Sequence, residues 1–462
     1  MRVICFDIDC LRPDHLGCHG YARPTSPAID AVAAEGVRFE RYYCASSPCL
    51  PSRAAWVTGR YGIHNGVISN HGAGARFRFE QVSRRTGEHF DSTIAREPEL
   101  LPRHLRVHGW ETATISNFAD RHGANWFLYG WSETHSVNLK GGRETAPEVT
   151  KKVLRWLRAN ADRDRWFLHV NFWDAHRAYK MDGSWTQRFR NHPVPQRWPE
   201  ETTIREHGRL KGPLTALAQW PNARSPFPLM PGAIRDRRDF EQLVTGYDAA
   251  IAYVDHHIGI ILNELDRQGA LADTAVIVTA DHGDPFGEHG IYGDHFTADE
   301  CIQRVPLIMR WPGLSRGGVD RALLSNVDFY PTLCDLMGVP LPALTDGRSF
   351  AAHLRSQPGP GRDFLVWDTA CYAAQRAVRT AELLLLRTYD PFGCPVRPLE
   401  LFEIEKDPFQ TRDVAGERPD LVAQCDALLD GWLREQREKP YAIADPMGDV
   451  MKERGLEWRP QT

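Results

Sequence analysis

Apolar runs typical of buried strands alternate with amphipathic segments typical of helices over most of this chain. Strands are expected at 3–8, 112–116, 166–172, 275–279 and 305–309, and helices at 27–36, 52–60, 98–108, 149–160, 243–265 and 329–337. Strands that alternate with helices form a mostly parallel sheet with helices on both of its faces. The sequence therefore predicts an α/β fold.

The pattern changes beyond about residue 362. Short strands are expected close together at 364–367, 377–379 and 383–387, followed by a final helix at about 419–437. This change predicts a large α/β domain over 1–361 and a small C-terminal α+β subdomain, with an antiparallel sheet, over 362–462. Two further segments, 66–95 and 181–237, show little periodicity and are expected to be loops, the second a long surface excursion.

Composition narrows the class of protein. The 462 residues are 42% hydrophobic and 25% charged, which is ordinary for a globular protein. The formal net charge of -4 gives no reason to expect a nucleic-acid partner or a polybasic membrane anchor. No apolar run is long enough to span a membrane. The chain is therefore expected to bind neither nucleic acid nor membrane.

The ten cysteines are scattered, and no Cys-x-x-Cys pair occurs among them. A zinc ribbon or a dithiol redox pair is therefore not expected. The N-terminus leads directly into the first predicted strand without the apolar region of a signal peptide. We accordingly expect a cytoplasmic protein with reduced thiols.

Candidate metal ligands follow two of the predicted strands. Asp9 comes directly after the first strand, and Asp281-His282 follows the strand at 275–279. Ligands bind outside the carboxyl ends of parallel strands, so these side chains are candidates for one divalent-metal site. Taken alone, each carboxylate has an alternative interpretation as a helix cap or a turn residue.

The most informative local segment is Cys49-Leu50-Pro51-Ser52-Arg53. A cysteine followed by a helix-starting Pro-Ser-Arg lies at a helix N-terminus, where unpaired N–H groups and the helix dipole favour anions. Arg53, one turn later, can direct its guanidinium at the same anion. The alternative is a buried structural cysteine at a loop-to-helix junction.

These residues and several further segments resemble the sulfatase family. The matching segments are Cys49 to Arg53 with Thr58-Gly59-Arg60, Asp9 to Gly20, Asp281-His282-Gly283 with Gly287 to Gly290, Arg304 to Gly313, and Leu401 to Ile404 with Asp407-Pro408. The resemblance spans nearly the whole chain. It implies the alkaline-phosphatase-like α/β fold and a sulfuric ester hydrolase whose Cys49 is converted to formylglycine by a maturation enzyme.

The resemblance also implies residue roles. Asp9, Asp281 and His282, together with residue 49, would bind one divalent metal, which is Mg, Mn or Ca. Arg53 would hold the hydrated aldehyde and substrate oxygens. His176 would protonate the leaving group. The substrate would be a sugar O-sulfate or N-sulfate, or a small sulfate ester.

The chain departs from the family pattern at several positions. Cys10 stands where the family often has a second metal-binding Asp, which favours Mg²⁺ or Mn²⁺ over an all-oxygen calcium site. Asn117 stands where the family often has a substrate-binding Lys. It can still donate a hydrogen bond to substrate, and Arg121 or His122 is the expected replacement for the missing charge. His295 is the expected substitute for a second such Lys.

Because of these departures, three alternatives to a sulfatase stay open. The first is a phosphonate monoester hydrolase or phosphodiesterase of the same superfamily, which shares the nucleophile and varies the residues around it. The second is an inactive binding relative. The third is a two-metal phosphatase that uses further ligands, for which the candidates are Asp284, Glu288, His289, Asp294 and His295. We expect most of these five to be loop residues that support the site.

Overall fold

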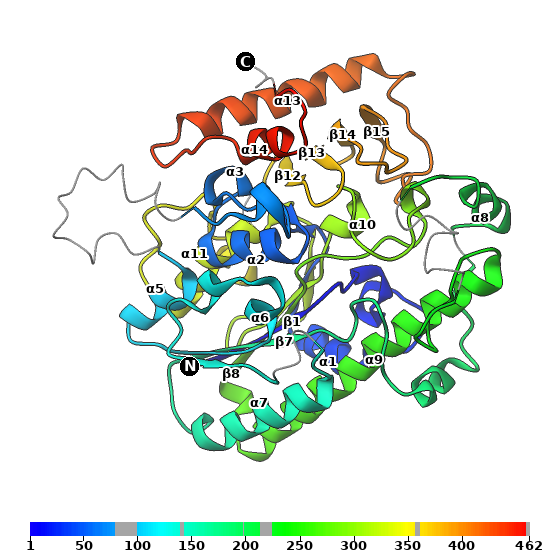
Figure 1. Cartoon of the computed structure of the whole chain (residues 1–462). Coiled ribbons are helices and arrows are strands. Elements are labelled where there is room, and N and C mark those ends of the chain that lie inside the picture. Colours follow the sequence, from blue (N-terminus) through cyan, green and yellow to red (C-terminus); the bar gives the residue numbers. More distant parts are fainter. Residues whose placement is uncertain (79–98, 139–142, 197, 213–223, 356–360, 459–462) are drawn as a thin grey trace.

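A twisted eight-stranded sheet crosses the larger part of the molecule in this computed structural model (Figure 1). The structure describes residues 1–78, 99–138, 143–196, 198–212, 224–355 and 361–458. The strand order is β10 (Gly318–Asp320), β2 (Val37–Phe39), β9 (Leu307–Arg310), β8 (Thr274–Thr279), β1 (Arg2–Ile8), β7 (Trp166–Phe172), β5 (Glu111–Ile115) and β6 (Glu133–His135).

Most neighbouring strands of this sheet are parallel. The central strands β8, β1, β7, β5 and β6 all run in one direction, whereas β9 is antiparallel to both β8 and β2. Strands β1, β7 and β8 are mostly apolar and almost every residue in them is buried, as expected where helices cover both faces. The predicted mostly parallel sheet is therefore confirmed.

Helices cover both faces of the sheet (Figure 1). One group contains α1 (Pro27–Glu35), α7 (Ala146–Asn160) and α9 (Arg237–Arg267), and the other contains α2 (Cys49–Thr58), α5 (Leu101–Val107) and α11 (Phe329–Met337). Helix α9 begins six residues before the prediction because Asp236 caps it by accepting a hydrogen bond from the Asp239 N–H. Shorter helices are α3 (Gly62–Asn65), α6 (Phe118–His122), α8 (Glu201–His207), α10 (Glu300–Gln303) and α12 (Ala351–Leu354).

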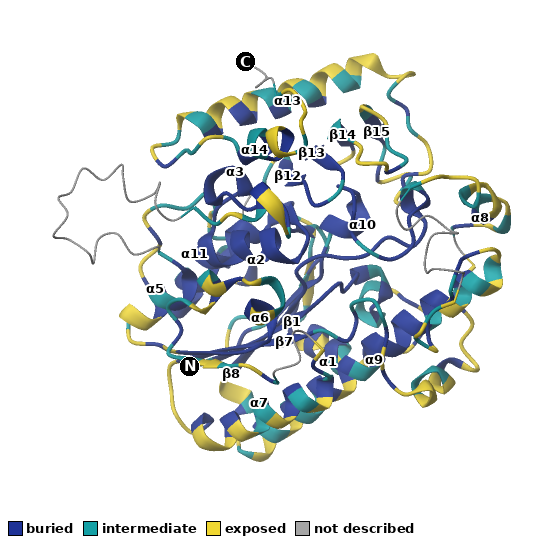
Figure 2. Cartoon of the chain, in the orientation of Figure 1, coloured by how far each residue is buried: buried dark blue, intermediate teal, exposed yellow. Residues whose placement is uncertain are grey.

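Helix α2 is buried on every side, and Figure 2 shows it in dark blue along its length. It begins at Cys49, three residues before the predicted start, and ends where Gly59 takes a left-handed conformation with φ 63°. A helix with this burial has no face left for water. Its first residue therefore lies inside the protein.

A smaller five-stranded sheet forms the C-terminal part. Its strand order is β15 (Leu399–Phe402), β14 (Leu384–Asp390), β13 (Ala374–Arg379), β12 (Leu365–Thr369) and β4 (Ser46–Ser47). The first four strands are antiparallel, as predicted, while β4 pairs with β12 in parallel. Helices α13 (Pro419–Glu438) and α14 (Pro446–Glu453) pack beside this sheet, and α14 was not predicted. The boundary at residue 361 stays a prediction.

Strands β3 (Tyr42–Tyr43) and β11 (Leu324–Ser325), both missed by sequence reasoning, form a parallel pair of their own. The predicted excursion at 181–237 contains α8 and a 3₁₀ segment at Gly183–Phe189, so it is more ordered than expected. The loop expected at 66–95 lies largely outside the described residues, although a 3₁₀ turn is present at Gly72–Ala75.

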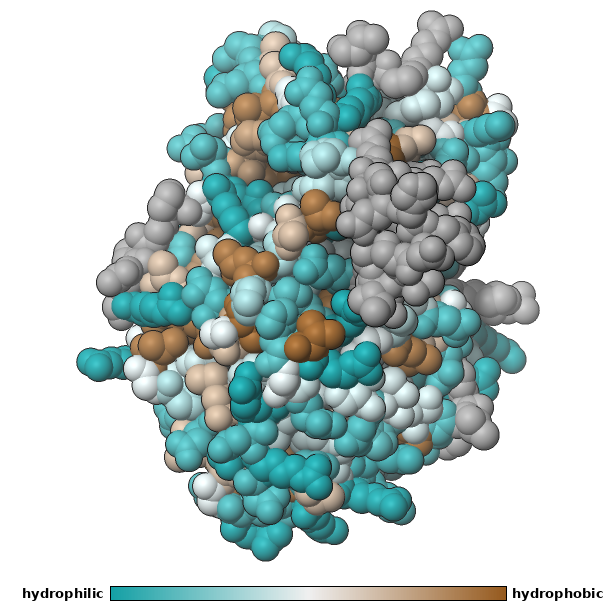
Figure 3. Space-filling view, turned by 90° about the vertical axis from the view of Figure 1, so that its left-hand side faces the viewer, coloured by the Kyte–Doolittle hydropathy of each residue, from teal (hydrophilic) through white to brown (hydrophobic). Residues whose placement is uncertain are grey.

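The molecule has an ordinary polar exterior. On the side seen in Figure 3, hydrophobic residues occupy small separate areas among hydrophilic ones. Within the described parts of the chain, we find no helix with the length and apolar character needed to cross a membrane.

Candidate active site

The predicted site residues lie at the carboxyl ends of neighbouring parallel strands. Asp9 follows β1, Asp281 and His282 follow β8, and His176 follows β7 by four residues. Because β8, β1 and β7 are adjacent in the sheet, their ends meet at one edge. Helix α2 brings Cys49 to the same edge.

Cys49 is the first residue of α2 and is buried. Its Sγ lies 3.2 Å from His282 Nε2 and 3.9 Å from Asp9 Oδ1. Burial, together with the negative charges of Asp9 and Asp281, raises the pKa of the Cys49 thiol well above its usual range. An unmodified thiol here is therefore a poor nucleophile at neutral pH.

Arg53 is surrounded by three carboxylates. Its Nε donates to Asp7 Oδ2 at 2.8 Å, its Nη1 to Asp281 Oδ2 at 2.6 Å, and its Nη2 to Asp9 Oδ2 at 3.1 Å. Although burial opposes ionisation, Arg53 holds the pKa of Asp7 and of Asp9 below their usual values. The pKa of Asp281 is raised, mainly by burial.

Asp7 was missed as a site residue. It lies inside β1, where a charged side chain is not expected, and His169 Nε2 lies 3.3 Å from its Oδ2. The signal was available in the spacing, because residues two apart in a strand project from the same face. Asp7 and Asp9 therefore had to lie on one side of the sheet.

The donor set fits a divalent cation. One ligand atom each from Asp9, Cys49, Asp281 and His282 lies within 4.8 Å of the others, and all four residues are buried. Three buried carboxylates, those of Asp7, Asp9 and Asp281, face the single positive charge of Arg53. These four side chains together carry a net charge of two negative units, which one divalent cation would balance. Burying that charge without a cation costs free energy.

A stack of three side chains lies beside this cluster. The Trp173 ring is 3.7 Å from the His176 ring at 18°, and the Arg121 guanidinium carbon lies 3.5 Å from the centre of the Trp173 ring. Trp173 was not predicted as a site residue, and its position directly after β7 was the only signal. Burial lowers the pKa of His176 to about 3, so this imidazole is neutral at pH 7.

Arg121 and His122, predicted to contact substrate, present donors without partners. Arg121 Nε and Nη1 and His122 Nε2 are buried and form no hydrogen bond within the described structure. Arg121 Nη2 donates to Asn171 Oδ1 at 3.2 Å. Burial, with the nearby Arg121 charge, lowers the pKa of His122 to about 3. Buried N–H groups without acceptors are uncommon and indicate a place for a ligand.

The Asn117 amide, unlike the side chains of Arg121 and His122, has all its hydrogen-bond contacts described here within the protein. Its Nδ2 donates to the carbonyl and side-chain oxygens of Asn138, both at 3.0 Å, and its Oδ1 accepts from the Val137 N–H at 2.6 Å. The amide therefore holds the 137–138 segment. Substrate binding by Asn117 stays a prediction.

His295 lies on the opposite side of His282, with the two ring centres 4.1 Å apart, and 5.7 Å from the His176 ring. Its Nδ1 is 3.1 Å from Asp284 Oδ1, and its Nε2 is 3.3 Å from Asp294 Oδ1. Burial disfavours its charge, but Asp294 and Asp284 outweigh burial and raise the pKa of His295 to about 9. His295 is thus a cation at pH 7, as expected of a substitute for Lys.

Two of the five loop residues considered for a two-metal site, Glu288 and His289, have other partners. Glu288 accepts from Arg12 Nη1 at 3.1 Å and from the Phe286 N–H at 2.6 Å. His289 lies 2.7 Å from Asp299 and 3.2 Å from Glu400. These contacts support the loop after β8.

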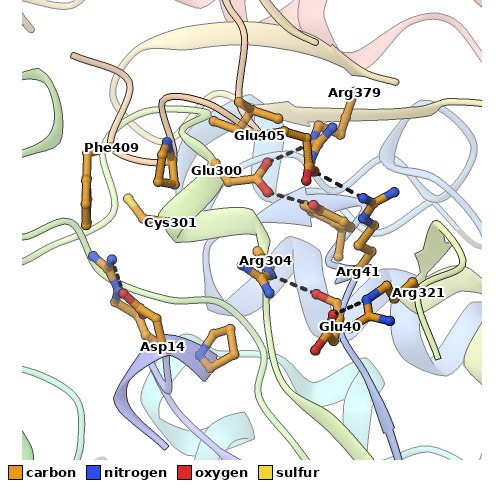
Figure 4. Close-up of a pocket in the computed structure, with 15 residues that line it drawn as sticks. Asp14, Glu40, Arg41, Glu300, Cys301, Arg304, Arg321, Arg379, Glu405 and Phe409 are labelled. Atoms are coloured by element: carbon orange, nitrogen blue, oxygen red, sulfur yellow. Dashed lines mark hydrogen bonds and ion pairs between the residues drawn. The ribbon is translucent and has the colours of Figure 1, made fainter. Parts of the chain in front are cut away.

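A separate charged pocket of about 370 Å³ is lined by Arg12, Asp14, Glu40, Glu300 and other residues (Figure 4). Its Arg and Glu side chains pair with one another across the pocket, for example Arg379 with Glu300 at 3.2 Å and Arg321 with Glu40 at 3.0 Å. The pocket wall contains none of the residues around Cys49. Its charges are therefore largely balanced within the pocket itself.

The sheet, the strand-end carboxylates and the helix-start residue together define a hydrolase of the alkaline-phosphatase-like class. The sulfatase family model matches residues 3–339, and the model for the C-terminal part of N-sulphoglucosamine sulphohydrolase matches residues 287–438. The chain belongs to the sulfatase family, and it is a sulfuric ester hydrolase.

Known proteins with similar sequences or folds include sulfatases and a phosphonate hydrolase. The chain is 24% identical to N-acetylglucosamine-6-O-sulfatase of Bacteroides thetaiotaomicron over 93% of this chain and 85% of that protein. A protein solved in complex with its substrate D-glucosamine-2-N,6-O-disulfate superimposes with a TM-score of 0.75 at 20% identity, covering 96% of this chain and 99% of that one. Phosphonate monoester hydrolase from Silicibacter pomeroyi superimposes with a TM-score of 0.73 at 20% identity over 96% of each chain. The two superpositions confirm the predicted fold.

Proposed function

We propose that this protein hydrolyses a sulfate ester carried by a sugar, using formylglycine made from Cys49 and one divalent metal. The sulfatase relative that acts on N-acetylglucosamine 6-sulfate, and the structural neighbour that binds a glucosamine disulfate, support a saccharide sulfate as the substrate. A maturation enzyme that modifies Cys49 is the partner that this proposal requires.

The unpartnered donors of Arg121 and His122 carry the proposal. Two N–H groups of Arg121 and the His122 Nε2 atom are buried without partners in the described structure; both side chains interact electrostatically with Asp9, and Arg121 does so with Cys49 as well. A sulfate group has several oxygen acceptors and satisfies such donors. Arg121 and His122 can therefore bind an anion next to the carboxylate cluster.

Asp9, Asp281 and His282 would hold the metal, which supplies positive charge to the anionic oxygens of the ester. When Cys49 is converted to formylglycine, the hydrated aldehyde supplies an oxygen nucleophile whose second hydroxyl allows the sulfate to be released as the aldehyde re-forms. Cys49 Sγ marks the place from which these oxygens would project. Arg53 orients them through its position between Asp9 and Asp281.

Two histidines next to Cys49 are assigned different roles in the reaction. His295 is protonated at pH 7 between Asp284 and Asp294, and one of its ring nitrogens lies within 4.8 Å of Cys49 Sγ and of a His176 nitrogen. His176 is neutral when the site is free of substrate and stacks on Trp173. We assign the binding of sulfate charge to His295. His176 would take up the proton that the attacking hydroxyl releases and would then donate it to the leaving oxygen.

Hydrolysis of a phosphonate monoester is the second candidate function. The similarity to a phosphonate monoester hydrolase and the replacement of a metal-binding carboxylate by Cys10 favour it. Location in the cytoplasm, with the ten free cysteines reduced, stays a prediction.

The test is a parallel assay on protein produced together with a formylglycine-generating enzyme. The substrates are an aryl sulfate, glucosamine 6-sulfate, glucosamine N-sulfate and a phosphonate monoester, with the Cys49→Ala variant as control. We expect the highest kcat/KM on a glucosamine sulfate and no turnover by Cys49→Ala. A higher kcat/KM on the phosphonate supports the second candidate, and a Cys49→Ala variant as active as its parent refutes both.

A further inference from the structure

The charged pocket of about 370 Å³ takes no part in the proposed hydrolysis. Pockets of about 300–1,000 Å³ hold small molecules, so a single sugar unit has room here. The described residues that line the pocket include five arginines and four acidic side chains, which are Arg12, Arg41, Arg304, Arg321 and Arg379, and Asp14, Glu40, Glu300 and Glu405. The charged side chains of the lining therefore carry a net charge of one positive unit.

Arg304 carries the positive charge that no carboxylate balances. Each of the other four arginines pairs with at least one acidic side chain, for example Arg12 with Asp14 at 2.9 Å. Arg304 Nε donates to the Glu40 carbonyl at 2.8 Å, and within the described part of the chain Arg304 forms no ion pair. In the view of Figure 4, Arg304 lies between Asp14 and Glu40. A guanidinium without a carboxylate partner is a planar set of donors that fits a carboxylate or a sulfate group.

Two buried groups near Arg304 also lack partners. His19 Nε2 and Arg38 Nε form no hydrogen bond within the described structure. Burial, together with the charges of Arg38 and Arg304, lowers the pKa of His19 to about 3, and the opposing charge of Asp14 has a smaller effect than either arginine. The electrostatic potential at His19 is therefore positive, as expected beside a guanidinium whose charge is not balanced.

The remaining wall of the pocket suits a sugar ring. Pro13, Ile404, Pro408 and Phe409 supply apolar surface. The half-buried Phe409 ring stacks on Trp198, with 5.5 Å between the ring centres and 25° between the ring planes. An aromatic ring offers a flat apolar face to the C–H groups of a sugar, and carboxylates accept hydrogen bonds from its hydroxyl groups. An anionic sugar therefore finds partners for its charge, its hydroxyl groups and its apolar face.

We propose that this pocket binds a sugar unit with one negative charge, either a uronic acid or a sugar sulfate, whose anionic group lies on Arg304 and whose ring packs against Phe409. The single negative charge of such a ligand balances the net charge of the lining. The choice of a sugar rests on the proposed function, whereas the binding of an anion does not. Because the pocket contains none of the residues around Cys49, the sugar bound here is not the one that is hydrolysed.

The pocket is tested by isothermal titration calorimetry on the Cys49→Ala variant, in which no sulfate ester is turned over. The probes are glucuronate, glucose 6-sulfate and glucose. We expect at least one of the two anions to bind at least tenfold more tightly than neutral glucose, and Arg304→Met to weaken this binding at least tenfold. If neither anion binds, or if glucose binds as tightly, the proposal is overturned.

Arg321→Glu and Arg205→Glu provide a matched pair of variants in the same background. Both arginine side chains are exposed, to 70% and 71%, and each pairs with one glutamate, but only Arg321 lines the pocket. Substitution of an exposed side chain rarely unfolds a protein. Arg321→Glu reverses one charge of the lining and should weaken anion binding at least tenfold, whereas Arg205→Glu should change it less than twofold. Equal effects of the two variants overturn the proposal.

The same pair of variants identifies the source of the anionic group. The anion whose affinity falls in Arg321→Glu and not in Arg205→Glu is the ligand of the pocket, because an anion bound only near Cys49 should respond to neither change. If the matured enzyme hydrolyses none of the esters, the proposed function fails. The calorimetry, which requires no turnover, still decides whether the pocket binds an anionic sugar.

Discussion

Replacement of Arg53 by Met tests whether the three carboxylates need a cation between them. The change removes three charge-assisted hydrogen bonds of 2.6–3.1 Å and leaves Asp7, Asp9 and Asp281 buried without their partner. Breaking a buried ion pair in this way costs about 3–5 kcal/mol. For 462 residues the unfolding entropy is about 1 kcal/mol/K, so the metal-free variant should lose about 3–5 °C in Tm.

A divalent ion should reverse part of this loss because it replaces the missing positive charge. Millimolar Mg²⁺ or Mn²⁺ should therefore raise the Tm of Arg53→Met more than that of the parent, as measured by differential scanning fluorimetry. The matched control is Arg205→Met, which breaks an exposed pair with Glu201 worth about 0–1 kcal/mol. If Arg53→Met and Arg205→Met lose the same Tm, or if metal stabilises parent and variant equally, the charge argument is wrong.

Two further predictions concern side chains outside the carboxylate cluster. Burial raises the pKa of Asp255 to about 7, so the folded protein favours its neutral form, and its contribution to stability is complete below about pH 4 and lost as the pH rises through 7. Asp255→Asn removes this titration but also replaces one of the two oxygens that accept from the Ala28 and Ile29 N–H groups, so the variant should be less stable than the parent at pH 4. This deficit should shrink by at most about 4 kcal/mol as the pH rises to 7, and parallel Tm curves over this range would contradict the assignment. Trp173→Leu removes the ring between Arg121 and His176 and should lower kcat/KM roughly tenfold. Trp173→Phe keeps an aromatic ring and should retain most of the parent's kcat/KM. Equal losses of kcat/KM in the two variants would show that the flat ring is not what matters.

The sequence was most informative where strands are covered on both sides. Runs such as 166–172 and 275–279 are mostly apolar and contain no charged Lys, Arg, Asp or Glu, and this marks them as central strands of a parallel sheet. The short strands β2 and β10, at one end of the sheet, were missed because three residues carry no periodic signal. Helix α8 was missed for a related reason, since seven residues with one buried side chain give a weak pattern.

From the sequence, the site residues that could be predicted were mainly those at strand ends and those in the Cys49 segment. Asp9, Asp281 and His282 stand at strand ends, where sheet topology brings ligands together. The stack of Trp173 on His176 depends on how the chain turns after β7, and the use of the Asn117 amide depends on the 137–138 segment lying beside it. Such side-chain contacts join segments that are distant in the sequence or shaped by loops, and no local pattern encodes them.

The C-terminal sheet takes part in positioning residue 49. Strand β4 is only Ser46–Ser47, yet it pairs with Asp368–Thr369 of β12, and Thr369 Oγ1 donates to the Ser47 carbonyl at 3.1 Å. Gln303 Nε2 donates to Ser47 Oγ at 2.7 Å. Because Pro48 alone separates β4 from Cys49, the nucleophile is held from one side by α2 and from the other by the C-terminal sheet. The smaller sheet therefore belongs to the machinery that fixes the site, although its strands carry none of the predicted metal ligands.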